Sequence, residues 1–395
     1  MGERTSTFII RNARLVLDDT VVESGWLRVE NGVIREMGEE NSFPQSVTGG
    51  SIDIIDAHGQ WVLPGLIDIH IHGGDGYEVM DGTVKAMEAI SRFHATHGTT
   101  GWLPTTLTAP IDDLERAVEA ASETARRPVY GAQVLGVHLE GPFISPERCG
   151  AQNPAFVIPP SIDVLERLAG VAEGLVKKVT IAPEREGAIE AIRWMRSHDI
   201  IPSIGHTDGT LAETLAGVSA GATHATHLFN AMRGLHHREG GTVGAVLLSE
   251  DVVCELIADG HHVDVDVMKL VYRVKGRDKM VLITDAMAAA GKPDGHYKLG
   301  ELDVIVEGGV AVLEEGHNLA GSTLTMDAAV RNMVRRVGVT MWDAAHMAST
   351  VPARELGLLN AKGSIALGKD ADLVMMDEAL HVVATWVAGQ QVFVR

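Results

Sequence analysis

The sequence predicts an α/β protein: a (β/α)₈ TIM-type barrel with a small β-sandwich domain formed by the N- and C-terminal segments. Three observations predict this class. Short apolar strand candidates alternate with helical stretches through the middle of the chain, both ends carry only hairpin-like patterns, and 395 residues suffice for a barrel with an appended domain. We expect the sandwich over residues 1–60 and 357–395 and the barrel over residues 61–356.

The N-terminal segment alternates apolar and polar residues in short runs, as half-buried strands do. Its strand candidates are Phe8–Ile10, Arg14–Leu17 and Trp26–Val29, and Asn31-Gly32 is a type I′ hairpin signal. The C-terminal tail shows the same pattern of short strand candidates over residues 371–376, 381–383 and 391–394. Because isolated hairpins are only marginally stable, we expect the two ends to pair into one small sandwich.

Eight strand candidates fill the central region, which is the number that closes such a barrel. They are Trp61–His72, Gly101–Thr106, Val134–Phe143, Val179–Pro183, Ile200–His206, Ala222–Phe229, Val252–Asp259 and Met280–Asp285. The helical stretches between them, such as Ile111–Arg126 and Gly187–His198, carry apolar residues three or four positions apart. Strand-helix alternation over roughly 290 residues fits a barrel better than a doubly wound sheet.

Charge and composition exclude several classes of partner. With 33 Lys and Arg against 53 Asp and Glu, the net charge is −20, so we expect neither nucleic acid nor a membrane as a partner. The chain shows no signal-peptide pattern and no apolar run of about 18 residues that would span a bilayer. Two distant cysteines, Cys149 and Cys254, indicate no disulfide framework. We expect a cytoplasmic protein, in which an anionic substrate needs a local cationic pocket.

Metal-ligating side chains recur where the predicted strands end. His70 and His72 share one face of the first strand because side chains alternate along a strand. Later strands end in the same way, at Glu140, His206, His227 and Asp285. Charged residues are seldom buried unless they are paired or coordinate a metal, and barrel strands end at one common mouth. The set therefore predicts a shared divalent-cation site rather than separate hydrogen-bonded side chains.

Two further polar residues share the faces of these candidates. Asp68 stands two residues before His70, and His138 stands two residues before Glu140. We expect them to orient ligands rather than to bind the cation themselves.

These residues carry a resemblance to a known family. Residues 63–73, Leu-Pro-Gly-Leu-Ile-Asp-Ile-His-Ile-His-Gly, resemble the first barrel strand of the metal-dependent amidohydrolase superfamily. Residues 138–143, 205–207, 226–232, 259–262 and 319–322, in this order, resemble the N-acetylglucosamine-6-phosphate deacetylases within it. The likeness runs from the N-terminal hairpins to the closing tail.

The resemblance implies hydrolysis of the acetamide of N-acetyl-D-glucosamine 6-phosphate to D-glucosamine 6-phosphate and acetate, in amino-sugar catabolism. It makes Glu140, His206 and His227 ligands of the principal metal and Asp285 the general acid/base that serves a metal-activated water. Some members carry the first-strand histidines and others replace them. Because His70 and His72 are both present, one or two divalent ions per subunit (Zn, Fe, Mn or Co) are expected, with Glu140 as the bridge between two.

Substrate contacts are also implied by the resemblance. The matching positions are Ala151, Gln152, Asn230, Ala231, Arg238, Asp259, Gly260, His261, His262, Leu319, Ala320, Gly321 and Ser322. Arg238 lies in the densest cationic loop of the chain, and a guanidinium matches phosphate geometry. In the family this arginine can reach the neighbouring subunit's site, so a homodimer is expected.

One loop departs from the family pattern. Many members carry a histidine in a Gly-x-His-Asn-Pro loop, whereas residues 150–154 read Gly-Ala-Gln-Asn-Pro. Gln152 donates hydrogen bonds but does not transfer protons near neutral pH, so we expect it to orient other groups. For Cys149, beside this loop, a passive role is favoured over that of a reactive thiol.

Three alternatives remain at this point. Deacetylation of N-acetylgalactosamine 6-phosphate differs at one hydroxyl group. The second alternative is another amidohydrolase, such as a dihydropyrimidinase-like ring opener or an N-acyl amino acid deacylase. Ring openers usually carry a metal-bridging lysine at the end of strand four. Here Lys177 and Lys178 stand at the start of that strand, which disfavours a ring opener. A non-catalytic scaffold is disfavoured because every expected position carries a competent ligand or acid/base.

Overall fold

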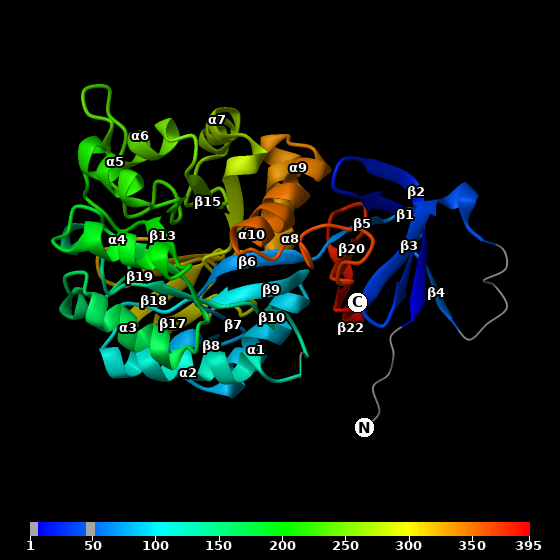
Figure 1. The fold of residues 1–395 in the computed structure, drawn as a ribbon, viewed down its shortest axis with the longest axis horizontal. Helices are drawn as coiled ribbons and strands as arrows, with labels where there is room; N and C mark the ends of the chain where they lie inside the picture. Colours follow the sequence, from blue (N-terminus) through cyan, green and yellow to red (C-terminus); the bar gives the residue numbers. More distant parts are fainter. Residues whose placement is uncertain (1–6, 45–51, 129) are drawn as a thin grey trace.

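The computed structural model describes residues 7–44, 52–128 and 130–395. A barrel with helices around it occupies one side of the molecule, and a sheet that holds both ends of the chain lies against the other side (Figure 1). The parts of the expected sandwich at residues 1–6 and 45–51 lie outside the described residues.

Both ends of the chain contribute strands to one eight-stranded sheet, in agreement with the predicted pairing of the two ends. Its strands are β1 (Phe8–Val16), β2 (Val21–Glu30), β3 (Val33–Glu39), β4 (Asp53–Asp56), β5 (Trp61–Pro64), β20 (Leu373–Met376), β21 (Val382–Val387) and β22 (Gln390–Val394). β5 pairs in parallel with β1 and antiparallel with β20, so it joins the N-terminal strands to the C-terminal ones. Asn31 (φ 53°) and Gly32 (φ 77°) link β2 to β3 in the left-handed conformation that a type I′ turn requires.

The barrel is a closed ring of parallel strands, and its prediction is confirmed. The eight strands are β6 (Leu66–Ile71), β9 (Thr99–Pro104), β11 (Val137–Glu140), β12 (Val176–Ile181), β13 (Ile201–Ile204), β14 (His224–Ala225), β15 (Val253–Ile257) and β16 (Met280–Ile283). β11 to β16 form one parallel sheet, and β6 pairs with β9, which also carries the short β10 (Gln133–Val134). Parallel bridges between Thr105 and His138 and between Ile71 and Ala286 close the ring.

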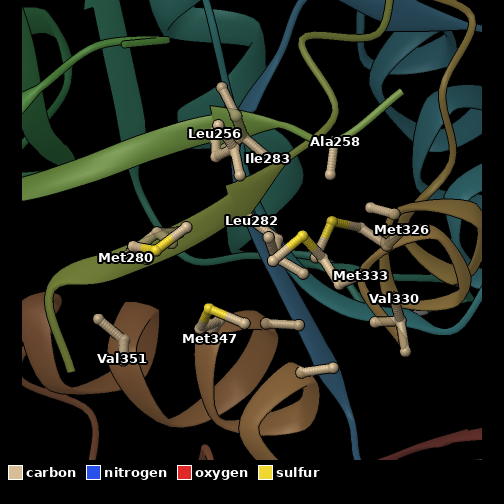
Figure 2. Close-up of a cluster of buried hydrophobic side chains, with 14 of the residues drawn as sticks. Leu256, Ala258, Met280, Leu282, Ile283, Met326, Val330, Met333, Met347 and Val351 are labelled. Carbon is tan, nitrogen blue, oxygen red and sulfur yellow. The ribbon is translucent and has the colours of Figure 1, made fainter. Parts of the chain in front are cut away.

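A helix follows each barrel strand before the next one begins. The helices are α1 (Val84–Ala95), α2 (Ile111–Ala125), α3 (Ile162–Val171), α4 (Ala188–Ser197), α5 (Leu211–Ala220), α6 (Gly241–Leu248), α7 (Val265–Lys275) and α8 (Met326–Asn332), followed by α9 (Met341–Ala345) and α10 (Val351–Glu355). Figure 2 shows part of this packing: Leu282 of β16 lies beside Met326 of α8 and Met333, which directly follows α8, within one cluster of buried hydrophobic side chains. Burial of such side chains fixes the strands, and hence the positions where they end.

The predicted first strand, Trp61–His72, is two strands in the structure. β5 belongs to the terminal sheet and β6 to the barrel, and the chain passes between them at Gly65. A Cβ atom on Gly65 would lie 2.2 Å from Thr100 Oγ1, and the Gly65 amide donates to Asp372 O at 2.8 Å. Residues on both sides of Pro64-Gly65 are apolar, so the predicted strand ran through this dipeptide although Pro-Gly is a turn signal.

An antiparallel sheet that the sequence analysis did not predict follows β16. It comprises β17 (Gly295–Leu299), β18 (Leu302–Glu307) and β19 (Val310–Leu313), and its buried face packs on Leu107 and Met287. A two-stranded ribbon, β7 (Gly73–Gly74) with β8 (Tyr77–Glu78), follows β6. Within the described ranges, no helix is both long and apolar enough to cross a membrane.

Candidate metal centre and active site

A cavity of about 470 Å³ opens at the C-terminal ends of the barrel strands. The barrel brings many of the predicted site residues to its wall although they are far apart in the sequence. Those that line it are His72, Glu140, Ala151, Gln152, His206, His227, Asn230, Ala231, His262, Asp285, Leu319 and Gly321.

Glu140, at the end of β11, lies between two pairs of histidines. Its Oε1 is 3.0 Å from His227 Nε2 and 3.4 Å from His206 Nε2. On the other side, Oε1 is 3.3 Å from His70 Nε2 and Oε2 is 3.1 Å from His72 Nε2. These side chains form two possible cation-binding groups that share Glu140, one with each histidine pair.

Hydrogen bonds on the far side of the rings orient three of the four imidazoles. His72 Nδ1 donates to Thr105 O at 3.1 Å, His206 Nδ1 donates to Arg148 O at 3.0 Å, and His70 Nδ1 donates to Glu255 Oε2 at 3.1 Å. Each ring therefore directs Nε2 inward.

The inward-facing nitrogens lie close to one another. The Nε2 atoms of His70 and His72 are 3.2 Å apart, and those of His206 and His227 are 3.1 Å apart. Lone pairs that converge in this way on a carboxylate repel each other unless a cation or proton lies between them. The donor set therefore fits a divalent cation.

The pKa values reflect the same excess of acceptors. Burial lowers the pKa of His72, but its hydrogen bonds to Asp285 and Glu140 outweigh burial and raise it to about 9. Burial raises the pKa of Glu140, yet the surrounding histidines hold it well below its usual value. Glu140 is thus a carboxylate at working pH, as a metal ligand must be.

Asp285 lies two residues after the end of β16 and faces the first-strand histidines. Its Oδ1 is 3.3 Å from His70 Nε2 and 3.1 Å from His72 Nε2. Burial raises the pKa of Asp285, but the charge of His70 and the hydrogen bond to His72 outweigh it and lower the pKa to about 2. The carboxylate is therefore ionised and able to accept a proton.

Three of these residues sit in left-handed backbone conformation just beyond their strands: His206 (φ 47°), His227 (φ 30°) and Asp285 (φ 53°). Non-glycine residues adopt this conformation only where the surrounding structure imposes it, and such residues cluster at functional sites. All three of these residues line the cavity.

Gln152 connects the loop after β11 to the cluster. Its Nε2 donates to Glu140 Oε2 at 2.7 Å, and its Oε1 accepts from the Thr108 amide at 2.6 Å. This geometry matches the orienting role expected of Gln152. Burial raises the pKa of the nearby Cys149, so its thiol stays protonated, in keeping with a passive residue.

The two residues expected to orient ligands lie behind the cluster. Asp68 Oδ1 accepts from the His70 amide at 3.1 Å, and Asp68 Oδ2 accepts from Thr284 Oγ1 at 2.6 Å. The ring of His138 packs edge-on against that of His70, with 4.6 Å between centroids.

Seven predicted residues do not line the cavity. His70 lies fully buried beneath it, and Asp259 stands behind His262, whose Nδ1 donates to Asp259 Oδ2 at 2.6 Å. Ser322 also lies behind the wall, where its amide donates to Asp285 O at 2.7 Å. The others are Gly260, His261, Ala320 and Arg238.

Arg238 is exposed on the loop between β14 and α6, where its nearest polar neighbour is His237. The structure thus does not bring this guanidinium to the cavity of its own chain.

Several lining residues escaped the sequence analysis: Leu107, Glu147, Arg148, Gly150, Leu299 and Asn318. Asn318 directly precedes the segment 319–322 that carries the family resemblance, so extension of that segment would have found it. Arg148 lies two residues before the loop 150–154, outside every such segment. Leu107 and Leu299 are ordinary apolar residues that carry no chemical signal.

The comparisons with known proteins agree with this geometry. The amidohydrolase family model matches residues 61–392. The chain is 41% identical to the N-acetylgalactosamine-6-phosphate deacetylase of Escherichia coli O157:H7, over 97% of this chain and 99% of that one. It is 38% identical to the N-acetylglucosamine-6-phosphate deacetylase of Bacillus subtilis, over 98% of each chain.

Solved structures show the same fold. The complex of a mutant N-acetyl-D-glucosamine-6-phosphate deacetylase from Mycobacterium smegmatis with N-acetyl-D-glucosamine-6-phosphate is 35% identical, with a TM-score of 0.91 over 98% of this chain and 99% of that one. The N-acetylglucosamine-6-phosphate deacetylase of Pasteurella multocida is 30% identical, with a TM-score of 0.92 over 98% of this chain and 100% of that one. The chain belongs to the amidohydrolase family.

Proposed function

We propose that this chain hydrolyses the acetamide of N-acetyl-D-glucosamine 6-phosphate to D-glucosamine 6-phosphate and acetate. One observation supports this proposal most: Glu140 lies between two histidine pairs, with Asp285 beside one of them, at the wall of a cavity of about 470 Å³. The relatives that match nearly the whole chain are named as deacetylases of phosphorylated N-acetyl amino sugars.

The roles that we propose follow from the geometry. Glu140, His206 and His227 would hold the principal divalent cation, and His70 and His72 would hold a second one together with Glu140. Such a cation supplies Lewis-acid activation of water and of the acetyl carbonyl. Zn, Fe, Mn and Co all suit a mixed imidazole and carboxylate site.

Asp285 would move the proton. As an ionised carboxylate at the cavity wall, it accepts a proton from the attacking water and delivers it to the departing amine nitrogen. Without this transfer the amine is a poor leaving group, so we assign general acid/base catalysis to Asp285.

The remaining cavity residues would bind the sugar. The Nδ1–H of His262 is held by Asp259, so its other ring nitrogen is available to a ligand. Asn230, Ala231, Leu319 and Gly321 line the same cavity, where they supply an amide, an apolar side chain and two small residues.

The phosphate group of the substrate needs positively charged side chains as partners. The cavity wall of this chain supplies only part of that charge, through Arg148. We propose a homodimer in which Arg238 of one subunit reaches the site of the other, and a cytoplasmic location in keeping with the cysteine usage.

Release of acetate tests the proposal directly. Purified protein loaded with cation should release acetate from N-acetylglucosamine 6-phosphate at least tenfold faster than from unphosphorylated N-acetylglucosamine. Equal rates on both sugars would exclude a phosphate-specific site, and no release from either would overturn the proposed function.

A second candidate is the galacto epimer of this substrate. The specific observation in its favour is the 41% identity to an N-acetylgalactosamine-6-phosphate deacetylase over nearly the full chain. The same assay with N-acetylgalactosamine 6-phosphate decides between them, since the physiological substrate should have the higher kcat/KM.

A further inference from the structure

A buried ion pair lies inside the barrel, directly beneath the proposed metal site. Lys178 on β12 and Glu255 on β15 are fully buried, and Lys178 Nζ contacts Glu255 Oε1. Burying two charges costs free energy, whereas burying well-packed apolar residues does not. A buried ion pair is therefore not explained by a contribution to stability alone. Its position suggests another purpose.

The second oxygen of Glu255 contacts both of the possible cation-binding groups. Oε2 accepts from His70 Nδ1 at 3.1 Å and from the backbone amide of His227 at 3.3 Å. His70 belongs to the group with His72, and His227 to the group with His206. One carboxylate oxygen therefore connects the ligand sets on both sides of Glu140.

Among the four imidazoles, only that of His70 has a charged partner behind it. Those of His72 and His206 donate to backbone carbonyls, and Nδ1 of His227 has no hydrogen-bond partner among the described residues. A carboxylate accepts hydrogen bonds and never donates them, so Glu255 fixes the ring proton of His70 on Nδ1 and leaves Nε2 free as a ligand.

We propose that Glu255 is a positioning residue that sets the affinity of the cation position formed by His70, His72 and Glu140. Its Oε1 contacts Lys178, and its Oε2 accepts the hydrogen bond from His70. The proposal deepens the proposed function because it concerns cation occupancy of that same site.

Two double variants separate positioning from a general effect of the ion pair. Both remove the buried pair: Lys178→Met with Glu255→Gln keeps a side-chain oxygen that can accept from His70, whereas Lys178→Met with Glu255→Leu keeps none. A merely structural role would affect both alike. Positioning predicts that only the leucine variant loses the hydrogen bond and with it the cation.

The chain offers a matched control in the terminal sheet. Lys362 Nζ lies 2.7 Å from Asp372 Oδ2, and both side chains are mostly buried outside the cavity. Lys362→Met with Asp372→Asn should lower the thermal midpoint and leave cation binding unchanged.

The experiment is equilibrium dialysis of the chelator-stripped full chain against Mn²⁺ or Zn²⁺, with ions per chain counted and thermal midpoints measured in parallel. Wild type should bind two ions. The glutamine variant should hold the weaker ion within about threefold of wild type, and the leucine variant should hold it about 10-fold to 100-fold more weakly.

The inference is overturned if the two double variants bind alike, if the control weakens binding as much as the leucine variant, or if wild type binds one ion only. The dialysis contains no sugar. A chain that shows the expected binding but releases no acetate would therefore overturn the proposed function and leave this inference standing.

Discussion

Asp285 is the residue on which the proposed proton transfer depends. We predict that Asp285→Asn retains its bound cation, because Glu140 and the histidines stay in place, while kcat falls at least about 100-fold, the usual scale for a general acid/base. Metal content and acetate release measured on the same preparation check this. Near-normal turnover in the cation-loaded variant would remove Asp285 from the chemistry.

Gln152 contacts the candidate metal ligand Glu140, so its expected role is to orient that carboxylate. Gln152→Ala removes the hydrogen bond at 2.7 Å to Glu140 Oε2. We predict a loss of about 10-fold to 100-fold in cation affinity or turnover, the usual effect of losing a partner that orients a ligand. Dialysis and kinetics on the variant measure both quantities, and wild-type values for both would show that Glu140 needs no such support.

The candidate ligand residues could be proposed from the sequence because imidazoles and carboxylates at strand ends contradict ordinary core packing. The residues that support them were harder to identify. Lys178 is the second of two adjacent lysines in β12, and Glu255 is the one charged residue of β15. The sequence alone does not distinguish a charge directed into the barrel from one at the surface. Only the register of β12 and β15 brings the two together.

At the scale of elements, the passage from β5 to β6 depends on a glycine. A Cβ on Gly65 would lie 2.2 Å from Thr100 Oγ1 and 2.8 Å from Thr100 Cβ. We predict that Gly65→Ala destabilises the chain by about 1–3 kcal/mol, as overpacking of a tight interior does. Denaturant unfolding measures the change.

Gly170 near the end of α3 provides the control, since a Cβ there meets nothing within 4 Å. Gly170→Ala should leave the free energy of unfolding unchanged or raise it by up to about 1 kcal/mol. Equal destabilisation by both substitutions would contradict the close approach at Gly65.

The helices and strands of the barrel were predictable because their periodicities are strong, whereas the sheet of β17 to β19 was not predicted. Its strands are short, and the sequence analysis identified no strand candidate between Asp285 and residue 371. A turn signal was present: Gly308-Gly309 joins β18 to β19 with φ values of 58° and 78°. Two-residue glycine turns of this kind mark hairpins and would have located the pair.

At the scale of the whole molecule, the sequence predicted both the barrel and the pairing of the chain ends. The division into residues 1–60 with 357–395 and 61–356 stays a prediction, because β5 and β6 run on with a single residue between them. The position of a neighbouring subunit is beyond the sequence of one chain.

Because the net charge is −20, a loop rich in positive charge is a candidate binding site for the phosphate group of the substrate. Arg238 is exposed, and no carboxylate of the described residues pairs with it. We predict that Arg238→Ala raises KM for N-acetylglucosamine 6-phosphate far more than for N-acetylglucosamine, since only the former presents a phosphate to a guanidinium. Steady-state kinetics on both sugars test this, and equal changes would remove Arg238 from phosphate binding.

The central claim is that a cation held around Glu140 makes this barrel a hydrolase. The most direct measurement follows acetate release from N-acetylglucosamine 6-phosphate while a divalent cation is added back to the chelator-stripped chain. The rate should be near zero without the ion and rise in proportion to the ions bound per chain. Full activity in the stripped chain, or none after the ion is bound, would contradict the claim.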